Sequence, residues 1–275
     1  MKKSLPIGPI VVVVLAALYF VLPLIATLNF SLSMLRGVWS FEAYRVVFHD
    51  ERFRSTFTFS VVAALCTIVL GALLIVPTAY WVRLKFPRMR PLVEFITLLP
   101  LVIPPIVLVF GYIRLYNSSS ILPFTGSAMG TNVLLVLGYV VLSLPYMFRA
   151  VDTGMAAIDI RTLTEAAESL GAKRTTILFG VILPNVKAAV LSGAFLTFAI
   201  VMGEFVLASL LNRPAFGPYL ALMGANRAYE PAALAVIAFA VTWVCMGMLQ
   251  VFGSQTPGRR RSGRSLFRFA RRANR

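Results

Sequence analysis

The fold of this chain is decided by long uncharged segments, of which residues 55–82 are the clearest: STFTFSVVAALCTIVLGALLIVPTAYWV. An α-helix needs about 20 apolar residues to cross the hydrocarbon layer of a bilayer, and this segment exceeds that length. The segment therefore predicts a helix that spans a membrane. Prolines inside such segments (Pro77, Pro100, Pro104, Pro105 and Pro145) have two interpretations: helices bent around a polar pathway, or ordinary prolines of membrane helices.

Five other segments have the same character, so the sequence predicts an all-α polytopic membrane protein with six spans. The first segment lies where a signal peptide would, but it is long and no small-residue cleavage site follows it, so we interpret it as a span. We expect one transmembrane domain over 1–256 and a basic tail over 257–275. The spans are expected near residues 8–30, 57–82, 95–115, 131–148, 188–211 and 232–253.

The composition supports this fold class and excludes two others. Of the 275 residues, 59% are hydrophobic and 13% are charged, whereas soluble domains average about 45–50% and about 25%. These values exclude an ordinary soluble enzyme and a disordered chain. The net charge is +16, but Lys and Arg lie between apolar blocks or at the ends, without interleaved stacking aromatics. We therefore expect lipid and not nucleic acid as a partner of the chain.

Basic residues are distributed unequally between the two sides of this topology. Cytoplasmic loops of membrane proteins carry an excess of Lys and Arg, so the richer side should be cytoplasmic. That side holds both termini and loop 149–187, and the basic tail there is expected to contact anionic lipid headgroups. The richer set is Lys2, Lys3, Arg83, Lys85, Arg88, Arg90, Arg149, Arg161, Lys173, Arg174, Lys187 and the tail; the poorer set is Arg36, Arg45, Arg52, Arg54, Arg114, Arg213 and Arg227.

Loop 149–187, RAVDTGMAAIDIRTLTEAAESLGAKRTTILFGVILPNVK, has the pattern of two short helices. Thr162 followed three residues later by Glu165 is a capping-box signature, which predicts a helix start. Gly171 is a natural helix stop. An amphipathic turn follows, and Pro184 is expected to end it. Together these features predict a compact corner at the membrane surface.

This loop resembles the EAA loop of permease subunits of binding-protein-dependent ABC importers. The resemblance is carried by Glu165-Ala166-Ala167, by Gly171 after three intervening residues, and by Val181-Ile182-Leu183-Pro184. Val181 stands where the family usually has Ile, which keeps the β-branched apolar character. The loop also lies between the fourth and fifth of six spans, where the family places it, and the resemblance extends from about Leu5 to Phe252.

The resemblance implies a mechanism and a set of partners. Glu165, Ala166, Ala167, Gly171, Leu183 and Pro184 would couple this chain to a cytoplasmic ATPase subunit. Two ATPases, a second homologous permease subunit and an extracytoplasmic solute-binding protein would complete a type I importer in the bacterial inner membrane. The alternative for the loop is a surface amphipathic hairpin that has no partner.

The chain itself offers no sign of catalysis. The phosphate-binding pattern GxxxxGK[ST] requires a Gly-Lys pair, which the sequence lacks, so ATP hydrolysis would belong to another subunit. Cys66 and Cys245 lie in apolar blocks without a CxxC pattern, which predicts buried hydrophobic side chains. We therefore expect no catalytic residues, no metal site and no cofactor.

Glu204 is the one acidic residue inside a predicted span. A carboxylate near mid-membrane costs about 2.5 kcal/mol or more, so it should face a polar cavity or a partner group. Two roles stay open: contact with a cationic solute, or bracing of neighbouring helices. Tyr112, Tyr139 and Tyr146 are further candidates for lining a pathway, together with Tyr116, since aromatic rings attract cations.

Within the family, the chain resembles the second permease subunit of spermidine/putrescine importers. The resemblance includes Leu99-Pro100-Leu101-Val102-Ile103-Pro104-Pro105 and Glu204 beside Met202. It implies a polyamine as the solute, with phosphonate, ferric iron and opines as alternatives. The rival class is an ion-coupled secondary carrier, which would need internally repeated halves and more intramembrane ionisable residues.

Overall fold

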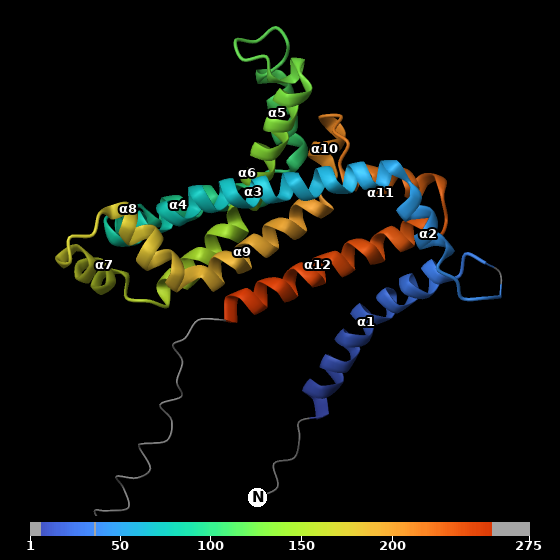
Figure 1. Ribbon diagram of the computed structural model, residues 1–275, viewed down its shortest axis with the longest axis horizontal. Helices are drawn as coiled ribbons and strands as arrows, with labels where there is room; N and C mark the ends of the chain where they lie inside the picture. Colours follow the sequence, from blue (N-terminus) through green and yellow to red (C-terminus); the bar gives the residue numbers. More distant parts are fainter. Residues whose placement is uncertain (1–6, 36, 255–275) are drawn as a thin grey trace, which may run out of the picture.

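The computed structural model describes residues 7–35 and 37–254, in which the regular elements are helices joined by loops, with no β-strand in those ranges (Figure 1). The basic tail at 257–275, Lys2 and Lys3 lie outside the described residues. The elements are α1 Ile7–Leu32, α2 Glu42–His49, α3 Glu51–Leu84, η1 Pro87–Met89, α4 Arg90–Val102, α5 Pro105–Leu115, η2 Phe124–Gly126, α6 Ala128–Ala156, α7 Ile160–Ser169, α8 Arg174–Thr176, η3 Ile177–Ile182, α9 Leu183–Gly203, α10 Val206–Leu210, α11 Phe216–Asn226 and α12 Glu230–Ser254.

The long apolar segments form the long helices, which confirms the all-α membrane fold. Five helical stretches of the described chain are long and apolar enough to cross a membrane: α1, α3, α6, the continuous stretch α8–α9, and α12. The bent pair α4–α5 brings the number to six if it counts as one span. The chain is therefore a multi-pass membrane protein.

The segment expected as one helix at 95–115 is broken. The axes of α4 and α5 differ by 95°, so that α5 projects away from the direction of α4 (Figure 1). The break lies at Ile103, whose ψ is 117° because the following residue is Pro104. The segment expected at 188–211 also breaks, since α9 ends at Gly203 and α10 begins at Val206.

The centre of the molecule is formed by α3, α6 and α9, with α12 against α9 (Figure 1). Small residues allow α6 and α9 to approach closely, as is common between membrane helices. A Cβ atom added at Gly154 would collide with the Cβ of Ala189, and one added at Gly193 would lie 2.6 Å from Met147 Sδ. These glycines therefore set the distance between the two helices.

The outer surface is apolar, as expected where lipid is the solvent. α1 packs on α12 and α2, and its other side chains, such as Tyr19 at 78% exposed, face outward. Cys66 was predicted to be buried, but it is exposed on α3, and Cys245 is half-buried. The prediction was wrong for Cys66 because an apolar side chain in a membrane helix is as stable facing lipid as facing the core.

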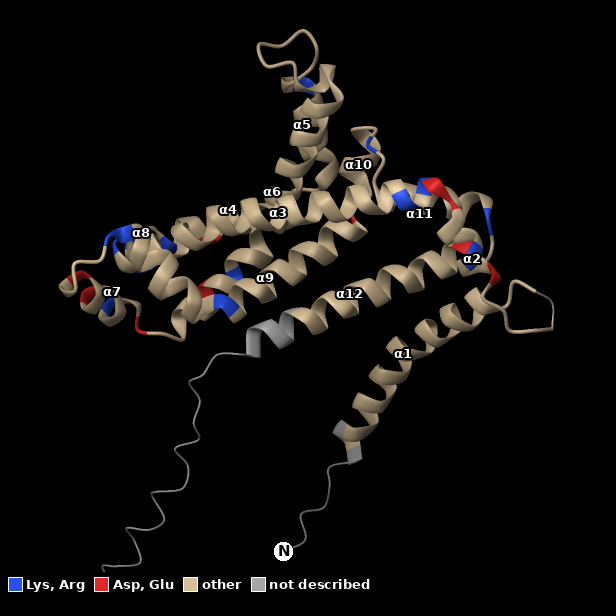
Figure 2. Ribbon diagram, in the orientation of Figure 1, with Lys and Arg blue, Asp and Glu red and all other residues tan. Residues whose placement is uncertain are grey.

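Charged residues gather at the two ends of the long helices (Figure 2). One end carries α7 and α8 and is called the α7 end here; the other carries α2 and is called the α2 end. At the α2 end, α11 is tied to α3, because Tyr219 Oη donates to Asp50 Oδ2 at 2.7 Å and the Phe216 N–H donates to Ser60 Oγ at 2.8 Å. The first turns of α1 and the last turns of α12 point toward the α7 end (Figure 1).

Candidate functional site

The helix α7 contains three of the six residues predicted to couple the chain to a partner: Glu165, Ala166 and Ala167. It begins earlier than predicted: Asp159, not Thr162, is the N-cap, and its Oδ1 accepts from the Thr162 N–H at 3.1 Å. The prediction was wrong because an Asp three residues upstream competes for the same role and also accepts from Thr162 Oγ1 at 2.7 Å. These hydrogen bonds hold the pKa of Asp159 below its usual value, and the bond from the Thr162 hydroxyl has the largest effect.

Gly171 ends α7, as predicted. Its φ of +78° is a left-handed conformation that side-chain-bearing residues rarely adopt. The Gly171 N–H donates to the Glu168 carbonyl at 2.9 Å, and the Ala172 N–H donates to the Ala167 carbonyl at 3.0 Å. This pair of bonds is a Schellman motif, which satisfies the last carbonyls of the helix and turns the chain sharply back.

The two faces of α7 have different environments. On the inner face, Ala167 is buried in the same apolar cluster as Tyr80, and the Thr164 hydroxyl lies 3.2 Å from Tyr80 Oη of α3. On the outer face, Glu165 and Ala166 are exposed, and Leu170 is 89% exposed. The structure therefore divides the predicted Glu-Ala-Ala motif: Ala167 fixes the helix to its own subunit, while Glu165 and Ala166 are available to a partner.

Leu183 and Pro184, the other predicted coupling residues, lie in a continuous helix from Arg174 to Gly203. The prediction that Pro184 ends a helix was wrong. Residues Ile177–Ile182 form a π-helical turn (η3), whose wider ring accommodates the missing proline N–H and the bulk of its ring. The start of this helix is held on α3, because Arg174 Cζ lies 5.6 Å from the centre of the Trp81 ring.

Glu204 lies in the break between α9 and α10 and is buried. Its Oε1 accepts from the Leu207 N–H at 2.8 Å and its Oε2 accepts from the Ala208 N–H at 3.2 Å. Both carboxylate oxygens are thus used to satisfy backbone donors at the start of α10. Gly217 of α11 lies directly against the Glu204 carbonyl, where a Cβ atom would collide with it.

The predicted tyrosines separate into two groups. The Tyr139 side chain is 1% exposed and lies beside Glu204; its hydroxyl makes no hydrogen bond of standard geometry with the described residues. Tyr112 of α5 packs edge-on against Tyr116 and approaches the same region at Gly138. Tyr146, in contrast, is 36% exposed on the surface of α6. The structure brings Tyr139 to Glu204, places Tyr112 against Gly138 of α6, and leaves Tyr146 apart.

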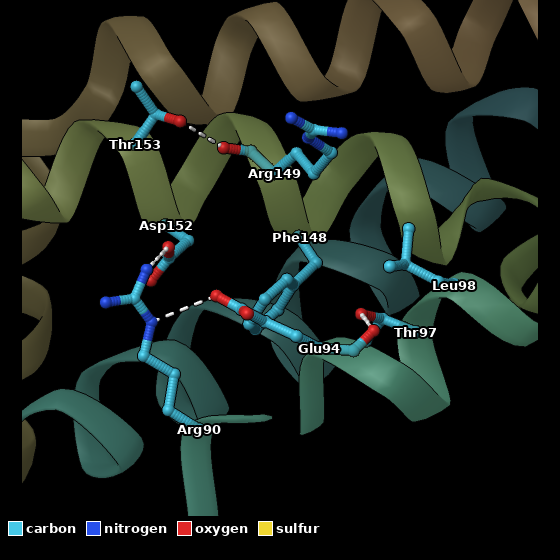
Figure 3. A pocket seen from close by; sticks show the side chains of 8 residues that line it. All are labelled: Arg90, Glu94, Thr97, Leu98, Phe148, Arg149, Asp152 and Thr153. Atoms are coloured by element: carbon cyan, nitrogen blue, oxygen red, sulfur yellow. Dashed lines mark hydrogen bonds and ion pairs between the residues drawn. The ribbon is translucent and has the colours of Figure 1, made fainter. Parts of the chain in front are cut away.

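A cluster of ion pairs at the α7 end was not anticipated from the sequence (Figure 3). Asp152 accepts from Arg83 Nε of α3 at 2.5 Å through Oδ1 and from Arg90 Nη2 of α4 at 3.0 Å through Oδ2. Arg90 Nε also pairs with Glu94 at 3.0 Å. The sequence predicted that a loop begins at Arg149. In the structure α6 continues to Ala156, so Asp152 lies in a helix.

The pocket beside this cluster has a volume of about 350 Å³ and lies between α4 and α6. A sequence signal for the cluster was available, since Asp152 is one of only 10 acidic residues in the chain. Its two partners are separated from it by 69 and 62 residues, however, so only the packing of the helices identifies them. The pocket is lined by Arg90, Glu94, Thr97, Leu98, Phe148, Arg149, Asp152 and Thr153.

A family model and solved structures match this chain. Residues 71–253 match the model of the family described as binding-protein-dependent transport system inner membrane component. A solved bacterial ABC transporter for import of the acidic polysaccharide alginate aligns with a TM-score of 0.71 at 12% identity, over 91% of this chain and 95% of that chain. At that identity the likeness shows the shared fold.

Curated relatives align over about half of their length. A probable molybdenum ABC transporter permease of Haloferax volcanii is 34% identical over 54% of this chain and 55% of its own. The molybdenum transport system permease ModB of Escherichia coli K12 is 35% identical over 45% and 56%. The spermidine/putrescine permease PotB of Haemophilus influenzae is 30% identical over 50% and 51%.

Proposed function

Since the chain belongs to the family of binding-protein-dependent transport system inner membrane components, we propose that it is the permease subunit of an ATP-driven importer. In this proposal the transmembrane domain is 1–256, the tail 257–275 contacts lipid headgroups, and the α7 end faces the cytoplasm. A second permease subunit, two ATPase subunits and an extracytoplasmic solute-binding protein complete the assembly. The chain carries the solute and the ATPases hydrolyse ATP.

The observation that carries the proposal is the construction of α7. Its inner face is fixed to α3 and its ends are fixed by Asp159 and Gly171, so it is a rigid projection. Its outer face presents Glu165, Ala166 and Leu170 to the outside. A small alanine allows a close approach, a glutamate supplies an ion-pair partner, and an exposed leucine supplies apolar area to bury. These are the properties of a docking element for an ATPase subunit.

For the solute, we propose an oxyanion of the molybdate type. Two of the relatives named above transport molybdenum. In addition, both oxygens of the Glu204 carboxylate are occupied by backbone N–H groups, so Glu204 braces the break between α9 and α10 and offers little to a cation. A polyamine is the second candidate, because PotB is also a relative and the aromatic ring of Tyr139 lies beside Glu204.

The test is uptake by the complete importer with the variant Glu165→Lys. The variant should lower ATP-dependent uptake by about tenfold or more, because a reversed charge at the docked face costs several kcal/mol. Co-purification of the ATPase should fall in parallel. The matched control is Glu42→Lys, an exposed glutamate at the α2 end, which should leave both measurements unchanged.

Labelled molybdate and labelled putrescine are compared in the same vesicles, and we expect uptake of molybdate alone. Uptake of putrescine alone would replace the oxyanion with the polyamine. Uptake that persists in Glu165→Lys and is abolished by a protonophore would identify a secondary carrier and contradict the importer proposal.

A further inference from the structure

The cluster around Asp152 joins three separate helices through one carboxylate, and Figure 3 shows its contact with Arg90. Arg83 belongs to α3, Asp152 to α6 and Arg90 to the first turn of α4. The side chains of Arg83 and Asp152 are 18% and 13% exposed, so the pair is largely removed from solvent. A carboxylate in such a place needs both of its partners, because an uncompensated charge there is strongly unfavourable.

Glu94 belongs to the same cluster but has a different consequence. Its ion pair with Arg90 lies within α4, four residues apart, and both side chains are more than 40% exposed. Such a pair contributes little to stability and joins no two elements. Of the two ion pairs that Arg90 makes, only the one with Asp152 joins α4 to another helix.

The position of Asp152 connects the α7 projection to the interior. α7 is fixed to α3 by Thr164 and Tyr80, and it follows α6 after only three residues, Ala157 to Asp159. α4 continues through the 95° bend into α5, which packs on α10 beside Glu204. A displacement of α7 thus reaches α3 and α6 directly, whereas α4 and α5 receive it through their packing on α6, in which the Asp152 cluster supplies the ion pair.

We propose that Asp152 is a positioning residue that makes α4 move together with α3 and α6, and so couples displacement of α7 to the helices around Glu204. The proposal rests on the proposed importer function. The pairs Arg83–Asp152 and Arg90–Asp152, called the latch here, hold α4 in a defined place against α6. Without the latch, α7 would still bind its partner, but its displacement would move α4 and the helices around Glu204 only in part.

The test measures solute uptake and ATP hydrolysis by the complete importer in vesicles, and uses their ratio. Asp152→Asn should lower the ratio of uptake to ATP hydrolysed by about tenfold while the ATPase still co-purifies, and Asp152→Glu should restore part of it. Glu94→Gln makes the same chemical change in the same cluster and should change the ratio by no more than about twofold. A loss of stability alone would lower both activities together and leave the ratio unchanged.

A second measurement needs neither solute nor ATPase. Spin labels at Phe95→Cys of α4 and Tyr146→Cys of α6, both exposed, report the distance between these helices in the full chain in lipid nanodiscs. Cys66→Ala and Cys245→Ala first remove the native thiols, so that only the two introduced thiols are labelled. The distance distribution should broaden in Asp152→Asn, and in Arg90→Gln if Asp152→Asn does not fold, but not in Glu94→Gln.

An unchanged distance distribution together with an unchanged ratio would overturn the latch. An equal loss in Glu94→Gln would also overturn it, because that pair joins no helices. Absence of ATP-dependent uptake in the unaltered chain would instead contradict the importer proposal, and the spin-label measurement would still decide on the latch.

Discussion

At the scale of single residues, the two ends of α7 are set by backbone hydrogen bonds. At the start, the Asp159 carboxylate accepts a hydrogen bond from the Thr162 N–H. At the end, Gly171 adopts a left-handed conformation, which lets its N–H donate to the Glu168 carbonyl. Both devices are local in sequence. They set where α7 begins and ends, whereas its packing on α3 holds this short helix in place and decides which face points inward.

The Asp159 cap leads to a dependence of α7 on pH. Hydrogen bonds from Thr162 lower the pKa of Asp159 in the folded chain, so its ionised form contributes stability above the pKa of the unfolded chain. That contribution is lost as the pH falls through the folded pKa, below the ordinary Asp value of about 4. Hydrogen exchange protection of the first turn of α7, corrected for intrinsic rates, should therefore fall on acidification.

Asp159→Asn is the control, because an amide can still cap but cannot titrate. Its protection should be independent of pH over the same range. Protection that increases on acidification in the unaltered chain would show that Asp159 does not stabilise α7 in its ionised form.

At the scale of elements, the close contact of α6 and α9 depends on glycine. Gly154→Val should separate these helices, because a Cβ at Gly154 already collides with Ala189. The expected loss is about 1–3 kcal/mol, as for other overpacked cores, and thermal unfolding in detergent measures it. Gly111→Val is the control, since nothing lies within 4 Å of a Cβ there; an equal loss in both variants would refute the packing argument.

The elements also show what the sequence predicts well and what it does not. Apolar length located the long helices, because a bilayer imposes that length on every span. Proline did not locate the breaks: Pro77 and Pro145 lie inside unbroken helices, while Pro104 follows a 95° bend. Whether a proline breaks a helix depends on the packing of neighbouring helices and on turns such as η3. The local sequence around the proline does not reveal either of these.

The candidate site was predictable to a similar degree. The Glu165 motif is recognised by its resemblance to a family pattern, and the glycine stop at Gly171 follows from the local sequence. The latch does not, since Arg83, Arg90 and Asp152 come from three helices and meet only after these have packed. The inward position of Ala167 has the same cause, because burial on α3 is a tertiary contact.

At the scale of the whole molecule, the two charged ends define an orientation that can be measured. We expect the α7 end to be cytoplasmic, following the excess of Lys and Arg there. In whole cells, a membrane-impermeant maleimide should label Trp39→Cys in the loop near α2 but not Leu170→Cys after α7. Both positions are strongly exposed, and Cys66→Ala with Cys245→Ala removes the native thiols.

Inverted membrane vesicles provide the control for accessibility, because the labelling pattern should be reversed in them. Labelling of Leu170→Cys in intact cells would place the α7 end outside. Such a result would contradict the assigned orientation and remove α7 from the reach of any cytoplasmic ATPase.

The π-helical turn η3 has a consequence for how the outward projection is aimed. A π turn holds one residue more than an α turn, and each residue of an α-helix advances the direction of the following side chains by about 100°. A π turn rotates less per residue than an α turn, so η3 takes up this surplus residue, and deleting one residue within Ile177–Ile182 should restore α-helical winding with little change in the direction of the flanking turns. The π turn therefore lets the chain hold one more residue ahead of Pro184 while Glu165 keeps its direction of presentation.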